Sequence, residues 1–388
     1  MPLTAKLVTR GRRSSLSLRI KAGGRIFKFR KGSAANWAKK IIPLTSLLAV
    51  AAMTVGCLTP QSLTPVPPST QFSDSSPEIA TPSARNDKGE AITRHFTWSY
   101  WPYGDYQWTW EIQIPQALYD YYRAKPRPPT KNYTVYVTDS KDDAYTGDLA
   151  NKLKEEAQRI NLDEYDTMHF AASFVQSLAY TSDLTTTGYD EYPRYPIETL
   201  VDEGGDCEDT SILLAELLDT MGYDVVLVSL PSHVAIGVSE GHGFCGTYYE
   251  HNGKRYFYLE TTGEAGRIGV VPHEYASEPA YIYHIVPVPI LTHTWEATAE
   301  ERSYKLTTVV ENLGTAPVHD TYILAGFDAG QDRLWNPTKS DSFALKEGQS
   351  ATVTMLLKIP TGKHTRLTIH VINNGHSADK SDSDWFNT

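Results

Sequence analysis

The stretch that decides the fold is Gly204-Gly205-Asp206-Cys207-Glu208-Asp209-Thr210, which runs directly into an apolar segment over residues 211–221. Aliphatic side chains fall on most faces of a helix drawn through that segment, so the sequence predicts a helix that is buried on most of its surface. Gly222 predicts the end of this helix. A cysteine therefore opens a buried helix, where backbone N–H groups and the helix dipole favour the thiolate.

Downstream of this helix the pattern predicts an antiparallel sheet. Residues 225–230 and 234–238 form two apolar runs of strand length. Asn252-Gly253, a strong signal for a two-residue hairpin, separates two further runs at 248–250 and 255–261. One buried helix followed by antiparallel strands predicts an α+β fold.

Upstream of the helix, aromatic residues alternate over 96–100 and 106–114, on either side of a Pro-Tyr-Gly-Asp turn. A period of two predicts a hairpin. Its aromatic face either packs on the core or forms a wall that lines a substrate site. Helical periods over 144–161 and around 170–178 predict two helices before the cysteine.

The last part of the chain, from about residue 291, shows no helical period. Short alternating runs follow at 304–310, 321–327, 350–357 and 366–372, with glycine-containing turns between them. Evenly spaced strands of this kind predict an all-β sandwich. The pattern resembles the immunoglobulin-like accessory modules of surface proteins.

Three residues point to nucleophilic catalysis. Cys207 begins the buried helix, His233 stands at the mouth of a strand, and Glu260 ends the strand of the second hairpin. A cysteine nucleophile needs a base, and the base needs a group that orients it. Neighbouring strands can set a histidine and a carboxylate side by side. Taken alone, a cysteine in this place is more often a small packing residue, so the assignment depends on all three.

These residues lie in motifs that resemble a known family. The motifs are Gly-Gly-Asp-Cys-Glu-Asp at 204–209, His-Val-Ala-Ile-Gly-Val at 233–238 and Tyr-Leu-Glu-Thr-Thr at 258–262. In this order they resemble the transglutaminase-like core of the papain-like cysteine enzyme superfamily. Residues 174–180 and 192–200 are also similar to that family, especially to its secreted archaeal and bacterial members. The resemblance covers roughly residues 92–287.

The resemblance implies that Cys207 is the nucleophile, His233 the general base and acid, and Glu260 the orienting carboxylate. Most family members have Asp where this chain has Glu260, which is one methylene longer. The family acts on amides through a thioester, in transamidation, deamidation or peptide hydrolysis. We therefore expect a cysteine-dependent acyltransferase or peptidase whose partner is a protein or peptide substrate.

An oxyanion hole is also required. The backbone N–H of Cys207 is the first candidate donor, and the side chain of Gln176 is the second. The alternative for Gln176 is an amide on a helix face that bonds to backbone. We expect no cofactor and no metal, because the sequence shows no phosphate-binding glycine loop, nucleotide motif or cluster of metal ligands.

Two other features receive non-catalytic interpretations. An acidic stretch lacks the ligand spacing of a calcium loop, and we predict that it is the solvated start of a helix; its members are Asp139, Asp142, Asp143 and Asp148. Cys245 lies in a glycine-rich loop and is predicted to be a spare thiol.

The N-terminal part predicts export from the cytoplasm. Residues 1–56 hold 12 Lys and Arg and no acidic residue, and residues 41–56 form an apolar run shorter than a membrane-spanning helix. These features, with small residues before a cysteine, are typical of a secretory signal. Thr54-Val55-Gly56-Cys57 resembles a bacterial-type lipobox in which Cys57 would be lipidated. The alternative is a signal anchor that stays in the membrane.

The chain of 388 residues is long enough for two or three domains. We expect a targeting segment over 1–57, a Pro/Ser/Thr-rich disordered linker over 58–91, a catalytic domain over 92–289 and a β-sandwich over 290–388. After residue 56 the chain has 24 basic and 46 acidic residues, which argues against nucleic acid as a partner. The alternative function is an inactive binding or scaffold protein at the cell surface, which would use the aromatic hairpin and the sandwich.

Overall fold

The computed structural model describes residues 90–388 except 105, 128, 129, 240, 243, 264 and 265, together with the backbone of residues 19–22, 25–28 and 78–79. Cys57 and most of the predicted targeting segment and linker lie outside the described residues. The chain divides into two compact units at Thr64. The described part of the first unit is an antiparallel pair of strands, β1 (Arg19–Ala22) and β2 (Arg25–Lys28).

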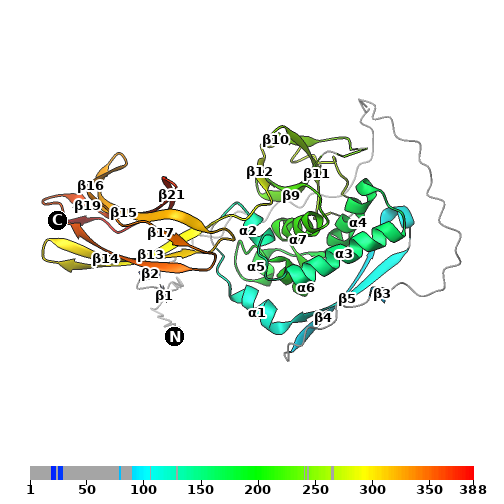
Figure 1. Cartoon of the computed structure of the whole chain (residues 1–388), viewed down its shortest axis with the longest axis horizontal. Helices are drawn as coiled ribbons and strands as arrows, with labels where there is room; N and C mark the ends of the chain where they lie inside the picture. The colour runs from blue at the N-terminus through cyan, green and yellow to red at the C-terminus, as the bar shows by residue number, and fades with distance from the viewer. Residues whose placement is uncertain are drawn as a thin grey trace, which may run out of the picture. The chain divides into compact units, whose positions relative to one another are not determined.

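The first part of the second unit, up to residue 284, mixes helices with mostly antiparallel strands (Figure 1). Its helices are α1 (Gln116–Ala124), α2 (Thr134–Val137), α3 (Asp143–Arg159), α4 (Glu164–Gln176), α5 (Asp183–Thr186), α6 (Pro196–Asp202) and α7 (Cys207–Thr220). Its strands are β3 (Glu78–Ile79), β4 (Ala91–Ser99), β5 (Gln107–Pro115), β6 (Ala179–Tyr180), β7 (Gly204–Gly205), β8 (Val225–Leu230), β9 (His233–Ser239), β10 (Tyr248–His251), β11 (Lys254–Leu259) and β12 (Tyr281–His284).

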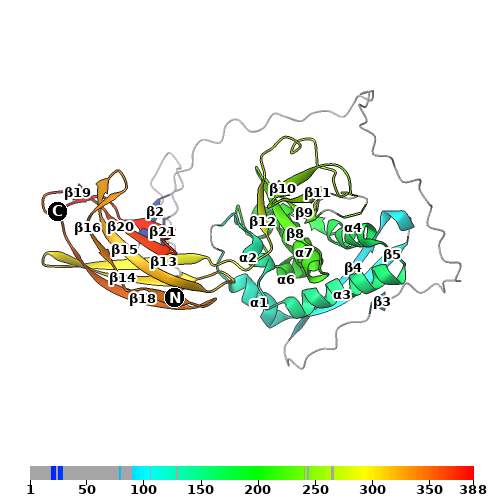
Figure 2. The same ribbon diagram turned by 45° about the horizontal axis from the view of Figure 1, so that its top comes forward.

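Helix α7 is the centre of this part. Five strands form an antiparallel sheet in the order β10-β11-β9-β8-β12. Helix α7 packs on β8 and β9 and also contacts α3, α4 and α6, as both ribbon views show (Figure 2). Its apolar residues are fully buried, as the sequence predicts. The other face of the sheet covers a smaller core around Tyr256 and Tyr258.

The predicted aromatic hairpin is confirmed as β4 and β5, which pair from Ala91↔Pro115 to Ser99↔Gln107. Its inward side chains are almost completely buried: Phe96, Trp98, Trp108 and Trp110. They pack against rings of α4, with Phe174 lying 5.2 Å from Trp98 and 5.3 Å from Phe96 between ring centroids. Of the two interpretations of this face, packing on the core is therefore the one observed.

The second predicted hairpin is also confirmed. Strands β10 and β11 are joined at Asn252-Gly253, where both residues have positive φ, of 51° and 77°. This conformation belongs to the tight turn whose twist matches that of the strands, and Asn-Gly adopts it at low cost. The sequence did not predict α1, α2 or β12; α2 and β12 have only four residues each, too few to show a clear period.

The C-terminal part, from Leu291, contains only strands. They are β13 (Leu291–Glu300), β14 (Ser303–Asn312), β15 (Val318–Gly330), β16 (Arg333–Lys339), β17 (Phe343–Leu345), β18 (Ser350–Lys358), β19 (His364–Thr365), β20 (Leu367–Asn373), β21 (His376–Asp382) and β22 (Phe386–Asn387). One sheet has the order β13-β14-β18, and another has the order β16-β15-β20-β21, with β17 beside β15. Side chains of both sheets form one separate buried core. The likeness to immunoglobulin-like modules stays a prediction.

Phe174→Ala tests the aromatic packing. Phe174 is fully buried against three rings of the hairpin, so its removal leaves a large cavity. We expect the free energy of unfolding to fall by about 3–5 kcal/mol, measured by urea denaturation. Tyr281→Ala, at a side chain that is 70% exposed, should change it by less than about 0.5 kcal/mol. Equal effects of the two variants would contradict the packing described here.

Candidate functional site

Cys207 is the first residue of α7, directly after the N-cap residue Asp206. Its thiol donates to Oε2 of Glu208 at 3.2 Å. It also accepts a hydrogen bond from the backbone N–H of Val234, the second residue of β9. This contact places the sulfur beside the residue that follows His233.

His233 begins β9 and is 7% exposed. It pairs with Leu230 across a two-residue loop, Pro231-Ser232. Pro231 fixes its own φ at a negative value, which suits the first central position of a type II turn. Ser232 has a φ of +56°, a region that favours glycine, so this turn stores some backbone strain next to the histidine. The turn fixes where His233 leaves the sheet.

Glu260 directly follows β11 and is held by several donors. Its Oε1 accepts from the backbone N–H groups of Thr261 and Thr262, both at 3.0 Å, and from the Thr262 hydroxyl at 2.7 Å. Its Oε2 lies 3.0 Å from Nε2 of His233 and accepts from the hydroxyl of Tyr258 at 2.5 Å. Both oxygens are therefore fixed, and the longer glutamate reaches the histidine directly.

This network assigns the tautomer of His233. The Tyr258 proton goes to Glu260, so Nε2 of His233 carries a proton that it donates to the same carboxylate. Nδ1 is then the basic nitrogen, and no hydrogen bond to it is found among the described residues. The ring stacks on Tyr275, with 4.4 Å between centroids and 3° between planes, which holds its orientation.

Hydrogen bonds tie the three segments together. The Ser211 hydroxyl in α7 donates to the carbonyl of Val234 at 3.0 Å. The hydroxyl of Thr261, next to Glu260, lies 2.9 Å from that of Thr210 and 3.1 Å from that of Ser211. The start of α7, the start of β9 and the end of β11 thus meet, as the sequence predicts. The catalytic roles of Cys207, His233 and Glu260 stay predictions.

The pKa values of Glu260 and Cys207 are shifted in opposite directions. Burial raises the pKa of Glu260, but hydrogen bonds from His233, Tyr258 and Thr262 outweigh it and bring the pKa to about 2. Burial raises the pKa of the Cys207 thiol, and the nearby Glu208 carboxylate raises it further. The expectation that the helix N-terminus favours the thiolate is therefore not met, because burial and, after it, the Glu208 carboxylate both oppose ionisation of the thiol.

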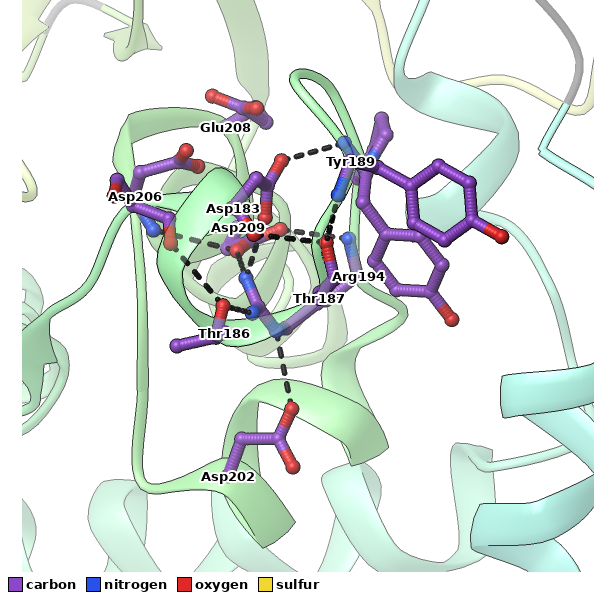
Figure 3. Close-up of polar contacts among 12 residues, drawn as sticks. Asp183, Thr186, Thr187, Tyr189, Arg194, Asp202, Asp206, Glu208 and Asp209 are labelled. Carbon is purple, nitrogen blue, oxygen red and sulfur yellow. Dashed lines mark hydrogen bonds and ion pairs between the residues drawn. The ribbon is translucent and has the colours of Figure 1, made fainter. Parts of the chain in front are cut away.

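Arg194 is the centre of a buried ionic cluster (Figure 3). Its guanidinium pairs with Asp183 at 2.9 Å, with Asp202 at 3.1 Å and with Asp209. Asp209 in turn accepts from the backbone N–H of Arg194 at 2.6 Å. It fixes the loop before α6 to the first turn of α7.

Gln176 lies at the end of α4. Its side-chain amide donates to the backbone carbonyls of Glu260 at 2.7 Å and of Gly266 at 3.2 Å. Both amide hydrogens are thus in use, which disfavours the oxyanion role and favours the alternative of an amide bonded to backbone. The backbone N–H of Cys207 belongs to the first turn of α7, whose amides lack helical partners, and stays the better candidate.

Two groups of three carboxylates have ligand oxygens within 4.8 Å of one another. One group, Asp183, Asp206 and Glu208, lies beside Cys207, and the other, Asp142, Asp143 and Glu216, lies between α3 and α7. Arg194 already supplies positive charge to the first group through Asp183. The prediction of a solvated helix start is wrong for Asp139 and Asp142, which are buried, each with an oxygen 2.7 Å from the Tyr122 hydroxyl.

A cavity of about 610 Å³ lies next to this site but not on it. Trp101, Tyr165, Gln176 and Arg267 are among its lining residues, and none of the three predicted catalytic residues lines it. Its connection to the site runs through Gln176, which bonds to the carbonyl of Glu260. Cys245 is exposed and, like Cys207, forms no disulfide in the described part of the chain.

Sequence reasoning missed three residues that shape the site: Arg194, Tyr258 and Tyr275. Arg194 lies within residues 192–200, and nothing in that stretch indicates that its side chain is buried. Tyr258 is two residues before Glu260 and so on the same face of β11. Tyr275 lies outside any helix or strand, and no pattern marks it.

Glu260→Gln tests the charge of the Glu260 carboxylate. Its folded pKa of about 2 lies below the ordinary value of 4.5, so its ionisation stabilises the fold above about pH 4.5 and this contribution is lost as pH falls towards 2. The shift corresponds to about 3 kcal/mol. Between pH 5 and pH 2, wild type should lose about that much more stability than Glu260→Gln, measured by urea denaturation. Glu278→Gln, at an exposed carboxylate, should follow wild type, and parallel curves for all three proteins would contradict the assignment.

Glu208→Gln tests what keeps the thiol of Cys207 neutral. Removal of the carboxylate should lower the pKa of Cys207, and each unit gives about ten times more thiolate at a pH below that pKa. We therefore expect faster alkylation of Cys207 by iodoacetamide at pH 7.5, followed by peptide mass analysis. Glu203→Gln, at an exposed site in the same segment, should leave the rate unchanged. An unchanged rate in Glu208→Gln would assign the raised pKa to burial alone.

No protein-family model matches the chain, and no curated protein matches it. Among solved structures, the chain is similar to Legionella pneumophila LapG, with 16% identity and a TM-score of 0.27 over 42% of this chain and 89% of that one. It is also similar to a structure described as a TGase, with 15% identity and a TM-score of 0.25 over 42% of this chain and 40% of that one. A third match is red sea bream transglutaminase, with 11% identity and a TM-score of 0.23 over 73% of this chain and 60% of that one. The chain spans less than two thirds of the last two structures, and at these TM-scores we base the function on the site geometry.

Proposed function

We propose that this chain is an extracytoplasmic, transglutaminase-like cysteine enzyme that transfers or hydrolyses the acyl group of protein or peptide amides. One observation carries the proposal. His233 is held by the fixed carboxylate of Glu260 at the strand end where the thiol of Cys207 also lies. A nucleophile, a base and an orienting carboxylate are the parts that covalent acyl transfer requires.

The reaction begins with proton transfer from the Cys207 thiol to Nδ1 of His233. The thiolate attacks the amide carbonyl carbon, and the carbonyl electron pair moves onto the oxygen. The imidazolium then gives its proton to the leaving nitrogen, the C–N bond breaks and a thioester remains on Cys207. Water or a second amine, deprotonated by His233, attacks the thioester and releases the product and the thiol.

Glu260 and the helix N-terminus stabilise the charges that develop. The Glu260 carboxylate, ionised above about pH 2, faces the imidazolium that forms on His233. The backbone N–H of Cys207 is the proposed donor to the oxyanion. Tyr275 acts as a positioning residue, because its ring stacks on His233 and limits rotation of the imidazole.

We also propose that the protein works outside the cytoplasm, secreted or held at the cell surface by its N-terminal segment. The basic flank, the short apolar run and Cys57 support this proposal. The protein would be attached to the membrane in one of two ways, by a lipid on Cys57 or by an N-terminal segment that stays as a signal anchor. Among the described residues, no helix has both the length and the apolar character needed to cross a membrane.

The second candidate function is an inactive binding or scaffold protein at the surface. The raised pKa of the Cys207 thiol favours it, because a neutral thiol is a weaker nucleophile than a thiolate. The buried state of the aromatic hairpin disfavours it, because that face is not free to bind a partner. The two candidates differ in whether Cys207 reacts.

His233→Ala in the full chain separates these candidates. We expect alkylation of Cys207 by iodoacetamide between pH 6 and pH 8 to slow by about tenfold or more, because the thiol loses its proton acceptor. His242→Ala, at an exposed histidine, should not change the rate, and Cys245 serves as an internal reference. Labelling rates are measured by peptide mass analysis.

Activity is then measured as incorporation of a fluorescent primary amine into casein and as cleavage of the same protein without amine. Cys207→Ala should abolish both, and His233→Ala should reduce turnover by about a hundredfold or more. Slow labelling of Cys207 that does not depend on His233, without either product, would reject the enzyme and favour the binding protein. Product formation by Cys207→Ala would reject the thioester mechanism.

A further inference from the structure

Three carboxylates lie between α3 and α7, away from the candidate active site; we call them the α3–α7 carboxylate group. Asp142 is the N-cap residue of α3, Asp143 is its first residue, and Glu216 lies in the third turn of α7. One oxygen of each lies within 4.8 Å of the others. Asp142 is fully buried and Glu216 is 5% exposed, whereas Asp143 is exposed.

Glu216 is the unusual member of this group. Both of its carboxylate oxygens are buried, and neither accepts a hydrogen bond from the part of the chain that the structure describes. The hydroxyl of Thr146 lies close to Glu216 and donates to the backbone carbonyl of Asp142 at 3.3 Å; turned towards Glu216, its one proton would serve only one of the two oxygens. Buried polar groups are almost always hydrogen-bonded, and a buried unpaired charge is costly, so this carboxylate requires a partner.

Positive charge is scarce around the group. Lys125 forms its ion pair with Asp139, and within the described ranges no ion pair joins a Lys or Arg to the three carboxylates. Tyr122 adds to the shortage of donors. Its one hydroxyl proton lies between oxygens of Asp139 and Asp142, each 2.7 Å from the phenol oxygen, and can go to only one of them.

We propose that the α3–α7 carboxylate group binds a calcium ion. Calcium takes oxygen ligands at about 2.4 Å in flexible geometry, so two of its ligands lie up to about 4.8 Å apart. The three oxygens lie within 4.8 Å of one another, close enough to share one such ion. Magnesium demands a near-ideal octahedron, a stricter condition for carboxylates held on packed helices. The exposed Asp143 gives the ion a route from solvent and leaves room for water ligands.

The proposed ion is structural and independent of the proposed enzymatic function. Asp142 also accepts from the backbone N–H of Ile197 in α6 at 3.2 Å, so one ion would join three helices. Glu216 lies nine residues after Cys207 in the same helix, about 14 Å along its axis. The ion would therefore stabilise the buried helix that carries Cys207 without touching the reacting atoms.

Terbium luminescence in the full chain, stripped of metal with EDTA, tests the proposal. Tyr122 touches Asp142, so tyrosine excitation should sensitise a terbium ion bound there. We expect emission that calcium displaces, and a rise in melting temperature on addition of calcium. Glu216→Gln should weaken terbium binding by about tenfold or more and remove the calcium-dependent rise. Asp219→Asn, at an exposed carboxylate of the same helix, should behave like wild type.

Asp143→Asn guards against a folding defect in Glu216→Gln. Because this side chain is exposed, the variant should keep its melting temperature in EDTA and still bind terbium more weakly. Equal emission from wild type and all three variants would mean adventitious binding at the surface. A melting temperature that responds to pH but not to calcium would mean that a shared proton neutralises the carboxylates. Either result overturns the proposal.

Discussion

The burial of α7 is the constraint on which the rest of the α+β part depends. The helix is enclosed by a sheet on one side and by α3, α4 and α6 on others, so Asp209, Thr210 and Ser211 near its start are almost completely shielded from water. Each polar side chain at its N-terminal end must therefore find a fixed partner in the protein. Thr210 and Ser211 find theirs in Thr261 and Val234, and Asp209 finds Arg194. These partners bring the start of β9 and the end of β11 to the helix.

The site holds both Glu260 and Cys207 in place, but it favours ionisation of Glu260 alone. Glu260 is stabilised as a carboxylate by four donors besides His233, so the base is oriented before any substrate binds. Cys207 is positioned equally well but is kept neutral by burial and by Glu208. The helix dipole, worth at most about 2 kcal/mol for a partly buried charge, cannot offset a neighbouring carboxylate at hydrogen-bond distance.

Much of this could be predicted from the sequence because the signals are local. The apolar run after Cys207, the alternating aromatics and Asn252-Gly253 each depend on a short stretch of chain, and each predicted element is confirmed. The segments that carry Cys207, His233 and Glu260 could be identified from the order of the three motifs that resemble the family. The buried state of Asp142 could not be predicted, because it depends on Tyr122 and Ile197, which are distant in sequence. Tyr275 was missed for the same reason, because it stacks on His233, which is distant in sequence.

Two buried acidic residues of α7, Glu208 in its first turn and Glu216 in its third, lower the stability of the fold. An apolar residue at the place of Glu216 would avoid the cost of an unpaired buried carboxylate, and so would a neutral residue at the place of Glu208. A helix optimised only for packing would contain neither. Each of these carboxylates needs compensation from its surroundings: a cation or a proton at Glu216, and at Glu208 a donor such as the thiol of Cys207. Both requirements fall on one buried helix, at places about 12 Å apart along its axis.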